Sequence, residues 1–597
     1  MDSERHWLEH VYRGKLPQLT VRAVAFGMLI GVLMCLSNLY VFLKTGWSMG
    51  VTITAAILAF ATFRILSATR LTRTPLSALE NNVLTTVSSG AGYMTGGGNM
   101  AAFGALMMIT TVRPDALPMV AWLGTIAALG VVTAIPIKRQ LINKEALAFP
   151  TGTATAETIR VIHGGGAESA AAGARQARGL GIAAVLAALL AWLRDGMGWI
   201  PGQIGLPFSV AGRAAIDWTL AIKAEVVLVG AGALMSFRTA WSMLLGSVLT
   251  YMFLAPAMVE EGVITTVSYK AIAGFMVWPA ASLLVTSGLT SFALDWRSVA
   301  RSFTGLARIF GKNRAADNDP MDAIECPGWW FPAGYVLLGP IVVVLMGWLF
   351  KIPLWACLIA VPLAVVMGFV ASRVTGETDI TPTKAFGPVT QLVYGGIAPG
   401  NLPGNIMAAN VTAGIGLHAA DLLTTLKTGW LLGGNPRAQF WAQLFGVAVG
   451  AAVVVPAFNV LVPDSQVLGT DAWPAPSCLV WAGVSEAFAN GFAALGGAAR
   501  AGILAGGLLG IALALMERFA PARMKPFVPS PAGLGIAMVI PGSNGIAMFL
   551  GGLLAEILRR RSPALAGRYV VPVSSGLIAG ESLMGVAVAL WLAGVFG

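Results

Sequence analysis

Long apolar segments, separated by short polar loops, run along almost the whole of this chain. A helix needs roughly 20 apolar residues to cross a bilayer, because each residue adds about 1.5 Å and the hydrocarbon core is about 30 Å thick. The pattern predicts an all-α polytopic membrane protein. By length it offers about 15 full spans, near residues 21–43, 47–67, 81–112, 116–138, 179–195, 217–236, 239–258, 270–294, 329–350, 353–373, 402–426, 439–461, 500–517, 530–558 and 569–596.

Several apolar segments carry interruptions. The stretch 81–112 is glycine-rich at 90–98, which predicts a discontinuous helix. The segment 145–163 is too short and too polar for a lipid-facing span, so we expect a broken or re-entrant helix there. Two more short segments, 383–398 and 478–495, would form hairpins or crossings. Helix breaks are tolerated at membrane depth where protein or cavity water satisfies the freed backbone groups. We expect such breaks near 90–98, 150–152 and 399–404.

The composition agrees with a membrane location and excludes a large soluble domain. Of 597 residues, 56% are hydrophobic and 11% are charged, whereas soluble domains carry about 25% charged residues. The mean hydropathy is +0.77. Lys and Arg in cytoplasmic loops explain the net charge of +11, so no nucleic-acid partner is expected. The four cysteines show no CxxC spacing, which argues against a disulfide framework or a zinc site.

A hydrophilic connector at 295–328 divides the chain into an N-terminal membrane half, 1–294, and a C-terminal membrane half, 329–597. The connector is basic, and short basic loops stay in the cytoplasm. The first residues are also basic and lack a cleavage site, so we expect a cytoplasmic N-terminus and a retained first helix. The loop 462–477 carries acidic residues but no Lys or Arg, which places it outside.

The stretch 387–437 is apolar enough for a bilayer and yet rich in polar side chains, Gly and Pro. Polar side chains at membrane depth are costly, and they face a cavity or a partner helix. The pattern predicts irregular backbone and polar groups around a central site. The polar residues of this stretch include Gln391, Tyr394, Asn401, Asn405, Asn410, Thr412, His418, Asp421 and Lys427.

The pentapeptide LKTGW occurs twice, around Lys44 and Lys427, each time at the end of a long apolar segment. The residue six positions before each Lys is polar, Asn38 in one copy and Asp421 in the other. Chance is one explanation, but the shared position favours an internal duplication of the kind that frames substrate sites in secondary transporters. Loop charges put Lys44 outside and Lys427 inside, which favours an inverted repeat. A parallel repeat stays open, because the count depends on the short segments.

Several motifs resemble those of the oligopeptide transporter (OPT) family. They are YGGIAPGN, ANVTAG, AADLLTTLKTG, LLGGNPRAQFWAQ, NLYVFLKTG and the ENN at 80–82. The likeness covers most of the chain and is closer to the yellow-stripe-like and prokaryotic branch than to the eukaryotic peptide branch. The chain has Asn435-Pro436-Arg437 in place of the NPG motif of the peptide branch, and Lys351-Ile352-Pro353 in place of KIPPR. This departure from the motifs of the peptide branch bears on which substrate the protein carries, and not on its resemblance to the family.

The resemblance implies a secondary active transporter with about 16 crossings in the cytoplasmic membrane of a prokaryote. It implies proton-coupled uptake of short peptides or of peptide-like metal chelates, including siderophore-type complexes. The expected partners are this substrate, protons and the lipid bilayer, and a homo-oligomer is left open. An uncoupled channel would use the same polar lining. A membrane-embedded enzyme acting on lipid-linked substrates is the third class, but the sequence shows no P-loop, no catalytic spacing and no metal cluster. We therefore expect no catalysis and no cofactor.

Glu80, followed by Asn81 and Asn82, opens the span at 81–112 after a basic loop. The structural interpretation is an acidic helix start, which the helix dipole favours. The functional interpretation, favoured by the resemblance, places Glu80 in the cavity as a proton or cation site.

Asp421 lies deep in the stretch 387–437, and His418 can share its helix face because the two are three positions apart. A His–carboxylate pair suits a proton relay, and a hydrogen-bonded structural His is the alternative. Lys427 is six positions from Asp421, so the two do not pair on one face. The simplest role for Lys427 is to extend toward the membrane interface.

Two further pairs of polar residues carry similar alternatives. Asn405 and Asn410 would either satisfy freed backbone groups or contact the peptide-like backbone or carboxylate of a substrate. Gln391 and Tyr394 could share a helix face and have the same two interpretations.

Three more acids lie in apolar surroundings without an evident partner, which is a functional hypothesis by default. Glu157 is the cavity candidate of the segment 145–163, and Glu486 lies on the short segment 478–495. Glu581 is expected to interrupt the last span beside two glycines. Helix packing is the alternative for each of them. The coupling proton would be taken by one or more of Glu80, Glu157, Asp421 and Glu581.

Overall fold

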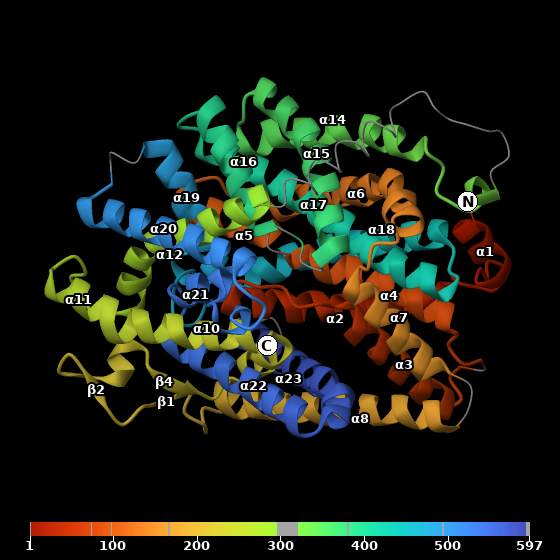
Figure 1. Cartoon of the computed structure of the whole chain (residues 1–597), viewed down its shortest axis with the longest axis horizontal. Helices are drawn as coiled ribbons and strands as arrows, with labels where there is room; N and C mark the ends of the chain where they lie inside the picture. The colour runs from red at the N-terminus through yellow and green to blue at the C-terminus, as the bar shows by residue number, and fades with distance from the viewer. Residues whose placement is uncertain are drawn as a thin grey trace.

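The computed structural model describes residues 2–72, 74–96, 98–164, 167–294, 320–378, 381, 383–491 and 495–592. It confirms the all-α class (Figure 1). The helices of the first half are α1 Asp2–His10, α2 Val21–Thr45, α3 Thr52–Ala68, α4 Ala78–Gly92, α5 Asn99–Ile109, α6 Ala116–Lys138, α7 Pro150–His163, α8 Ala167–Ala191, α9 Val226–Leu234, α10 Phe237–Val248, α11 Ala255–Glu260 and α12 Tyr269–Leu294. Those of the second half are α14 Trp330–Phe350, α15 Leu354–Thr378, α16 Thr383–Ile397, α17 Leu402–Leu432, α18 Pro436–Leu461, α19 Pro476–Asn490, α20 Gly497–Phe519, α21 Pro531–Ala537, α22 Gly542–Arg561 and α23 Pro563–Leu592.

Within the described residues, 11 helices are long and apolar enough to cross a membrane. This is fewer than the sequence predicts, because some expected spans are divided or shortened. The stretch 217–236 is not one helix, since its polar residues Asp217, Lys223 and Glu225 leave room only for a 3-10 turn, a strand and the short α9. The stretch 530–558 is divided into α21 and α22 at Pro541, which has no N–H to continue a helix. The number of crossings stays a prediction.

The strands are short and form two antiparallel pairs between α8 and α9. β1 Gln203–Gly205 pairs with β4 Ala221–Lys223, and Ile204 lies opposite Ile222. β2 Ser209–Val210 pairs with β3 Arg213–Ala214. The hairpins contain charged residues that an apolar span would exclude.

All three predicted breaks are present. α4 ends at Gly92, passes through a 3-10 turn at Tyr93–Thr95, and α5 resumes at Asn99. α7 begins at Pro150, directly after Phe149 in the left-handed region at φ 41°. α16 ends at Ile397 and α17 starts at Leu402. The connector from 295 to 319, and with it the predicted division into two membrane halves, lies outside the described residues.

α17 forms the centre of the molecule (Figure 1). Asn401 caps the start of the helix, and its side chain accepts a hydrogen bond from the Gly404 N–H at 2.8 Å. Gly433, which has a φ of 82°, caps the end. Its most apolar window is completely buried, and α4, α5, α6, α7, α15, α16 and α18 all pack on it. Each polar side chain of its central part must therefore find its partner within the protein.

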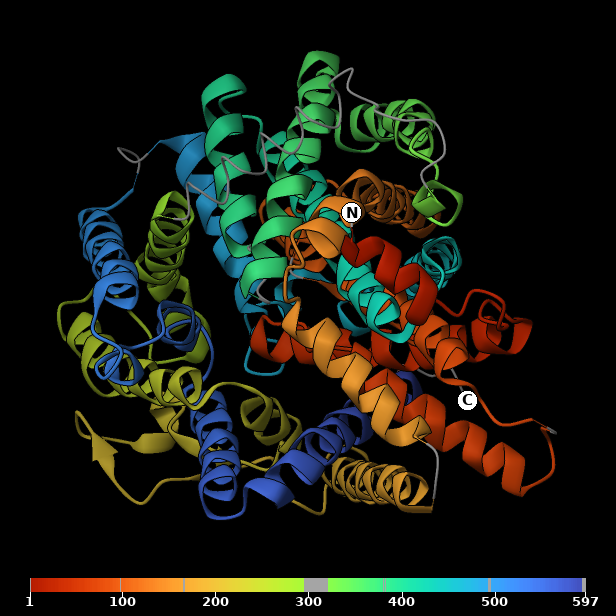
Figure 2. The same cartoon turned by 45° about the vertical axis from the view of Figure 1, so that its right-hand side comes forward.

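The N-terminal helix α1 lies across the C-terminal end of α17 (Figure 2). The Trp7 and Trp430 rings stack with centroids 4.0 Å apart, and Trp7 Nε1 donates to the Trp430 carbonyl at 2.7 Å. Burial alone would raise the pKa of Glu4, but hydrogen bonds from Arg139 and Asn143 lower it below its ordinary value. The ionised Glu4 thus ties α1 to the end of α6.

The two LKTGW copies lie at opposite ends of α18. The second copy precedes the tight turn that leads into Pro436, and Trp430 contacts α1. The first copy meets the loop after α18, where Lys44 lies over the Trp473 ring and the Ala475 N–H donates to the Leu43 carbonyl. α18 has 26 residues and extends about 39 Å, which is enough to separate two membrane surfaces. This arrangement is the one expected for an inverted repeat, whose orientation in the membrane stays a prediction.

We predict that cysteines placed at Glu9 and at Ser465, in a cysteine-free background, lie on opposite sides of the membrane. An impermeant maleimide added to whole cells should label Ser465→Cys, because its loop follows the far end of α18. It should label Glu9→Cys only after permeabilisation. Labelling of both sites from the same side would contradict the inverted arrangement.

Candidate functional site

Three helices meet in a polar seam at the centre of the protein. Residues three or four positions apart share one helix face, and each helix contributes one such row. The rows are Asn82, Thr86 and Ser89 on α4, Asp421, Thr425 and Gly429 on α17, and Gln439, Gln443 and Gly446 on α18. We refer to these nine residues as the polar seam, and all of them are buried.

Asp421 is the acidic group of the polar seam. Ser89 Oγ donates to its Oδ1 at 2.5 Å, and Gln443 Nε2 donates to its Oδ2 at 2.6 Å. Both donors are neutral, and Asp421 forms no ion pair with a described Lys, Arg or His. A carboxylate at membrane depth without a cation is costly, on the order of 2.5–3.5 kcal/mol on insertion scales. This geometry can hold the carboxyl group either ionised or protonated.

Close helix packing brings these donors within reach. A Cβ on Gly446 would lie 2.1 Å from the Val87 carbonyl oxygen, and a Cβ on Gly90 would lie 3.0 Å from the Gln443 carbonyl oxygen. Helices in lipid associate through such small-residue contacts and interhelical hydrogen bonds. Because α4 and α18 touch at their backbones, Ser89 and Gln443 can flank the same carboxylate.

The polar seam continues toward the end of α17. Gln439 Nε2 donates to the Thr425 carbonyl at 2.7 Å and to Thr86 Oγ1 at 3.3 Å. The amide of Asn82 and the Oε1 of Gln443 are buried without a hydrogen-bond partner among the described residues. Unpaired buried polar groups are rare and need an explanation, such as a ligand, a water molecule or a second arrangement.

A second cluster closes the gap between α4 and α5. Asn410 Nδ2 donates to the Gly98 carbonyl at 2.7 Å, and its Oδ1 accepts from Trp122 Nε1 at 2.8 Å. Asn410 thus satisfies a backbone group freed by the helix break, which is the structural alternative for this residue. His418 Nε2 lies 3.5 Å from Asn99 Nδ2, and its Nδ1 has no partner among the described residues.

The predicted His418–Asp421 pair is not formed in the described residues. Both oxygens of Asp421 are engaged by Ser89 and Gln443, and His418 contacts α5 instead. The three-residue spacing places both residues on the same side of α17. The side chain of Asp421 is nevertheless bound by α4 and α18, and that of His418 contacts α5.

A third cluster links α16, α17 and α19. Asn405 Nδ2 donates to the Gln391 carbonyl at 2.6 Å, and Ser485 Oγ donates to Asn405 Oδ1 at 2.8 Å. Gln391 Nε2 donates to Ser485 Oγ at 2.8 Å. Tyr394 takes no part, because its hydroxyl donates to the Ala356 carbonyl on α15 at 2.5 Å. Gln391 and Tyr394 therefore contact different helices and do not act as a pair.

Glu80 has the structural role of an acidic helix start. Ser77 and Glu80 form a capping box at the start of α4, and Arg22 holds the carboxylate at 2.6 and 2.8 Å. Its proposed place as a cavity proton site is therefore not supported by the geometry. Asn81 Nδ2 donates to the Ala56 carbonyl at 3.2 Å and lies 2.9 Å from His163 Nε2, which ties α4 to α3 and α7.

Two of the remaining acids differ from expectation. Glu157 lies on the exposed face of α7 and pairs with Arg160 at 2.6 Å, so it is not a cavity residue. Glu581 does not interrupt the last span, because α23 is continuous through it. Its carboxylate pairs with Arg194 at 2.7 Å and accepts from the Val227 N–H at 2.6 Å. Glu486 is half-buried on α19, without an ion pair among the described residues.

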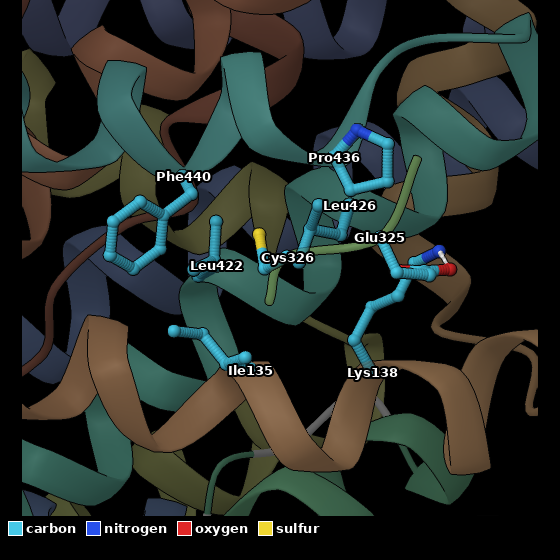
Figure 3. Close-up of a pocket in the computed structure, with 8 residues that line it drawn as sticks. All are labelled: Ile135, Lys138, Glu325, Cys326, Leu422, Leu426, Pro436 and Phe440. Atoms are coloured by element: carbon cyan, nitrogen blue, oxygen red, sulfur yellow. Dashed lines mark hydrogen bonds and ion pairs between the residues drawn. The ribbon is translucent and has the colours of Figure 1, made fainter. Parts of the chain in front are cut away.

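A small hollow lies between α6, α17, the start of α18 and the segment that precedes α14 (Figure 3). Lys138 of α6 and Glu325, which precedes α14, form an ion pair within its lining. Its walls are Ile135, Cys326, Leu422, Leu426, Pro436 and Phe440. The charges of this hollow are therefore already neutralised. Within the described ranges, no three His, Cys, Asp or Glu side chains converge to hold a metal ion.

Comparison with known proteins identifies the family and its class of function. The family model described as "OPT oligopeptide transporter protein" matches residues 18–592. The chain belongs to this family. It is a multi-pass membrane transporter and not an enzyme. The resemblance seen in the sequence motifs is confirmed.

The similar proteins with curated names are plant transporters. The iron-phytosiderophore transporter yellow stripe 1 of Zea mays is 26% identical, over 95% of this chain and 89% of its own length. The probable metal-nicotianamine transporter YSL16 of Oryza sativa subsp. japonica is also 26% identical, over 95% of this chain and 90% of its own length. The metal-nicotianamine transporter YSL2 of Arabidopsis thaliana is 23% identical, over 95% and 92%. The likeness to the yellow-stripe-like branch is therefore confirmed.

The tight α4–α18 contact leads to a stability prediction. Gly446→Ala places a Cβ 2.1 Å from the Val87 carbonyl oxygen, which forces the helices apart and should destabilise the protein by about 1–3 kcal/mol. Gly124→Ala is the control, because its Cβ would meet Ala451 at an ordinary 3.6 Å. The protein is heated in detergent to a series of temperatures, and size-exclusion chromatography measures the fraction that stays folded. The melting temperature should be lower for Gly446→Ala and unchanged for Gly124→Ala. Equal melting temperatures would contradict the close packing.

Proposed function

We propose that this protein is a proton-coupled secondary transporter that takes up peptide-like metal chelates across the cytoplasmic membrane of a prokaryote. Its OPT family membership and its yellow-stripe-like relatives support the substrate class. The proton coupling rests on one observation, which is a buried Asp421 held by two neutral donors.

The substrate class follows from the relatives and from the chemistry of a chelate. The names of the plant proteins assign them metal-nicotianamine or iron-phytosiderophore complexes. A chelated metal brings its own ligand atoms, so a transporter needs only to recognise the organic shell. Carboxylates and amide-like groups of such a shell match Asn, Gln and Lys side chains, which form hydrogen bonds with both. Short peptides present the same groups and remain the second substrate class.

Gln443 provides a mechanism for sensing the protonation state of Asp421. An ionised carboxylate accepts only, and Nε2 of Gln443 donates to it at 2.6 Å. A protonated carboxyl group must also donate. Rotation of the Gln443 amide would offer its Oε1, which has no partner among the described residues. Proton uptake by Asp421 would therefore turn the Gln443 amide, so that its Oε1 faces Asp421 in place of its Nε2.

The helix breaks offer places where such a change can move the backbone. The break between α4 and α5 lies beside the Asn410 cluster. The break between α16 and α17 lies beside the Asn405 cluster. Discontinuous helices next to a central site are a recurring feature of secondary transporters, in which one bundle moves against another. We assign the alternating motion to these two hinges.

The proposal predicts that Asp421→Asn abolishes proton-driven accumulation of nickel–nicotianamine in proteoliposomes and preserves exchange without a pH gradient. Asparagine keeps the size of the carboxyl group but cannot carry the proton. The measurement is radioactive nickel uptake after a pH jump, compared with counterflow at equal pH, with protein amounts matched.

Glu80→Gln is the matched control. It should retain proton-driven accumulation, because Glu80 is held by Arg22 at the start of α4. Accumulation by Asp421→Asn at the wild-type rate would remove Asp421 from the coupling mechanism. A wild-type protein that equilibrates nickel–nicotianamine but never concentrates it would favour an uncoupled channel.

A further inference from the structure

A row of unpaired polar atoms runs along the polar seam and past its end. Oε1 of Gln443, both amide atoms of Asn82 and Nε2 of Gln18 are buried and have no hydrogen-bond partner among the described residues. The three side chains follow one another from Asp421 toward the end of α17 that meets α1. Because unpaired buried polar groups are uncommon in folded proteins, three in succession call for one common explanation.

The neighbour of Asn82 on α4 shows that the missing partners are a property of one helix face. Asn81 is equally buried, and its Nδ2 donates to the Ala56 carbonyl at 3.2 Å and lies 2.9 Å from His163 Nε2. Its Oδ1 accepts from Thr85 Oγ1 at 3.3 Å. Asn82 is only 1% exposed and has none of these contacts. The unpaired amide therefore belongs to the face of α4 that packs on α17 and α18.

Asn82 and Asp421 lie about two helical turns apart along the polar seam. Gly429 follows Asp421 by eight positions on α17, or about 12 Å. A Cβ on Gly429 would lie 3.0 Å from Asn82 Nδ2, so Asn82 lies at the height of Gly429. The turn between them carries Thr86 and Gln439, whose Nε2 donates to Thr86 Oγ1 at 3.3 Å. Polar side chains therefore follow one another at intervals of one helical turn from Asp421 to Asn82.

Two glycines keep side chains away from the Asn82 amide. A Cβ on Gly434 would reach within 3.5 Å of Asn82 Nδ2 and 3.3 Å of the Gly429 carbonyl oxygen. The helices are too close here for a chelate, since a Cβ on Gly429 would already lie 1.9 Å from Gln439 Oε1. The ligand that fits such a place is a water molecule, which needs about two to four polar partners.

Gln18 connects this row to the surface of the protein. Its Oε1 accepts from the Asn435 N–H at 2.8 Å, directly after Gly434, and its Nε2 has no partner among the described residues. Gln18 is buried, but Pro17 and Leu19 on either side of it are exposed. The row therefore ends just beneath the side of the protein that the loop charges place in the cytoplasm.

We propose that Asn82 binds an internal water molecule, and that water molecules along the polar seam carry the Asp421 proton to the cytoplasmic side. The direction of this proton transfer rests on the proposed function, whereas the water site at Asn82 does not. Asn82 acts as a positioning residue, because its amide neither gains nor loses a proton. Donation by its Nδ2 and acceptance by its Oδ1 fix the orientation of the water molecule.

Proton release along this row is balanced at each step. The O–H bond of the protonated Asp421 breaks, its electron pair stays on the carboxylate, and the proton passes to a water molecule. That molecule gives one of its protons to the next, so that one proton in total reaches the cytoplasm and no oxidant or reductant is needed. The donors Ser89 and Gln443 stabilise the carboxylate that remains. Loss of the water site would therefore slow proton release and leave substrate binding in place.

The first test compares the melting temperatures of Asn82→Leu and Asn81→Leu. Leucine has the branched shape of asparagine without its polar atoms. Asn82→Leu should keep or raise the melting temperature, because it removes an amide that has no partner among the described residues. Asn81→Leu is the matched control and should lower it, because the Ala56 carbonyl loses its donor. A lower melting temperature for Asn82→Leu than for Asn81→Leu would show that Asn82 is structural and would overturn the proposal.

Uptake of radioactive nickel–nicotianamine into proteoliposomes tests the role in transport. Asn82→Leu should slow accumulation after a pH jump by about tenfold or more, whereas counterflow exchange at equal pH should continue. Asn82→Ser, which keeps a polar group, should recover most of the rate. If Asn82→Leu does not fold, Gly434→Ala replaces it, because its Cβ would cover the amide of Asn82 without removing a side-chain hydrogen bond. Accumulation at the wild-type rate by folded Asn82→Leu or Gly434→Ala would overturn the proton route.

Silver ion, which is close to a water molecule in size, tests the water site without any substrate. The assay uses the protein in nanodiscs, with its native cysteines replaced. Silver should react with the thiol of Asn82→Cys and protect it from later alkylation in denaturant, and it should leave Asn81→Cys unprotected. If Asn82→Cys is protected but the wild type does not accumulate nickel–nicotianamine, the transport proposal fails and the water site stands. Equal protection of both cysteines, or of neither, would overturn the water site.

Discussion

A buried helix that carries polar side chains imposes the main constraint on this structure. α17 is enclosed on all sides along its central part, and in a bilayer no solvent is present to satisfy its Asn, His, Asp and Thr groups. Each neighbour therefore has to present a complementary group at the matching height. α4 and α18 supply Ser89 and Gln443, α5 supplies the Gly98 carbonyl, and α19 supplies Ser485. The small residues at these contacts, such as Gly446, follow from the same constraint, because a larger side chain would move the donors out of range.

The distribution of charge distinguishes α17 from the rest of the protein. Elsewhere, buried charges in the described ranges are paired, as in Arg194–Glu581 and Lys138–Glu325. On α17, Asp421 has only neutral donors, and Lys427 has no partner among the described residues. Unpaired charges at membrane depth are kept where a proton, an ion or a substrate completes the pair.

The sequence predicts features that depend on local pattern, and it misses those that depend on which helices face each other. The length of apolar runs predicts most helices, and the Gly and Pro clusters predict the breaks before α5, α7 and α17. Asp421 and Lys427 are found because they are polar residues in an apolar run. The partners of these residues cannot be found in this way. Ser89 is 332 positions from Asp421, and no local pattern reveals that contact. Glu80 and Glu581 look unpaired in the sequence for the same reason, because Arg22 and Arg194 are distant along the chain. One signal was available, which is the helical spacing of Asn82, Thr86 and Ser89.

The central claim is that Asp421 exchanges a proton when substrate binds. Infrared difference spectroscopy tests it directly, because a protonated carboxyl group absorbs separately from a carboxylate. Nickel–nicotianamine added at constant pH to the protein in nanodiscs should increase the protonated carboxyl band, and Asp421→Asn should lose that change while still binding the chelate. An identical band in wild type and Asp421→Asn, with both proteins saturated, would contradict the account.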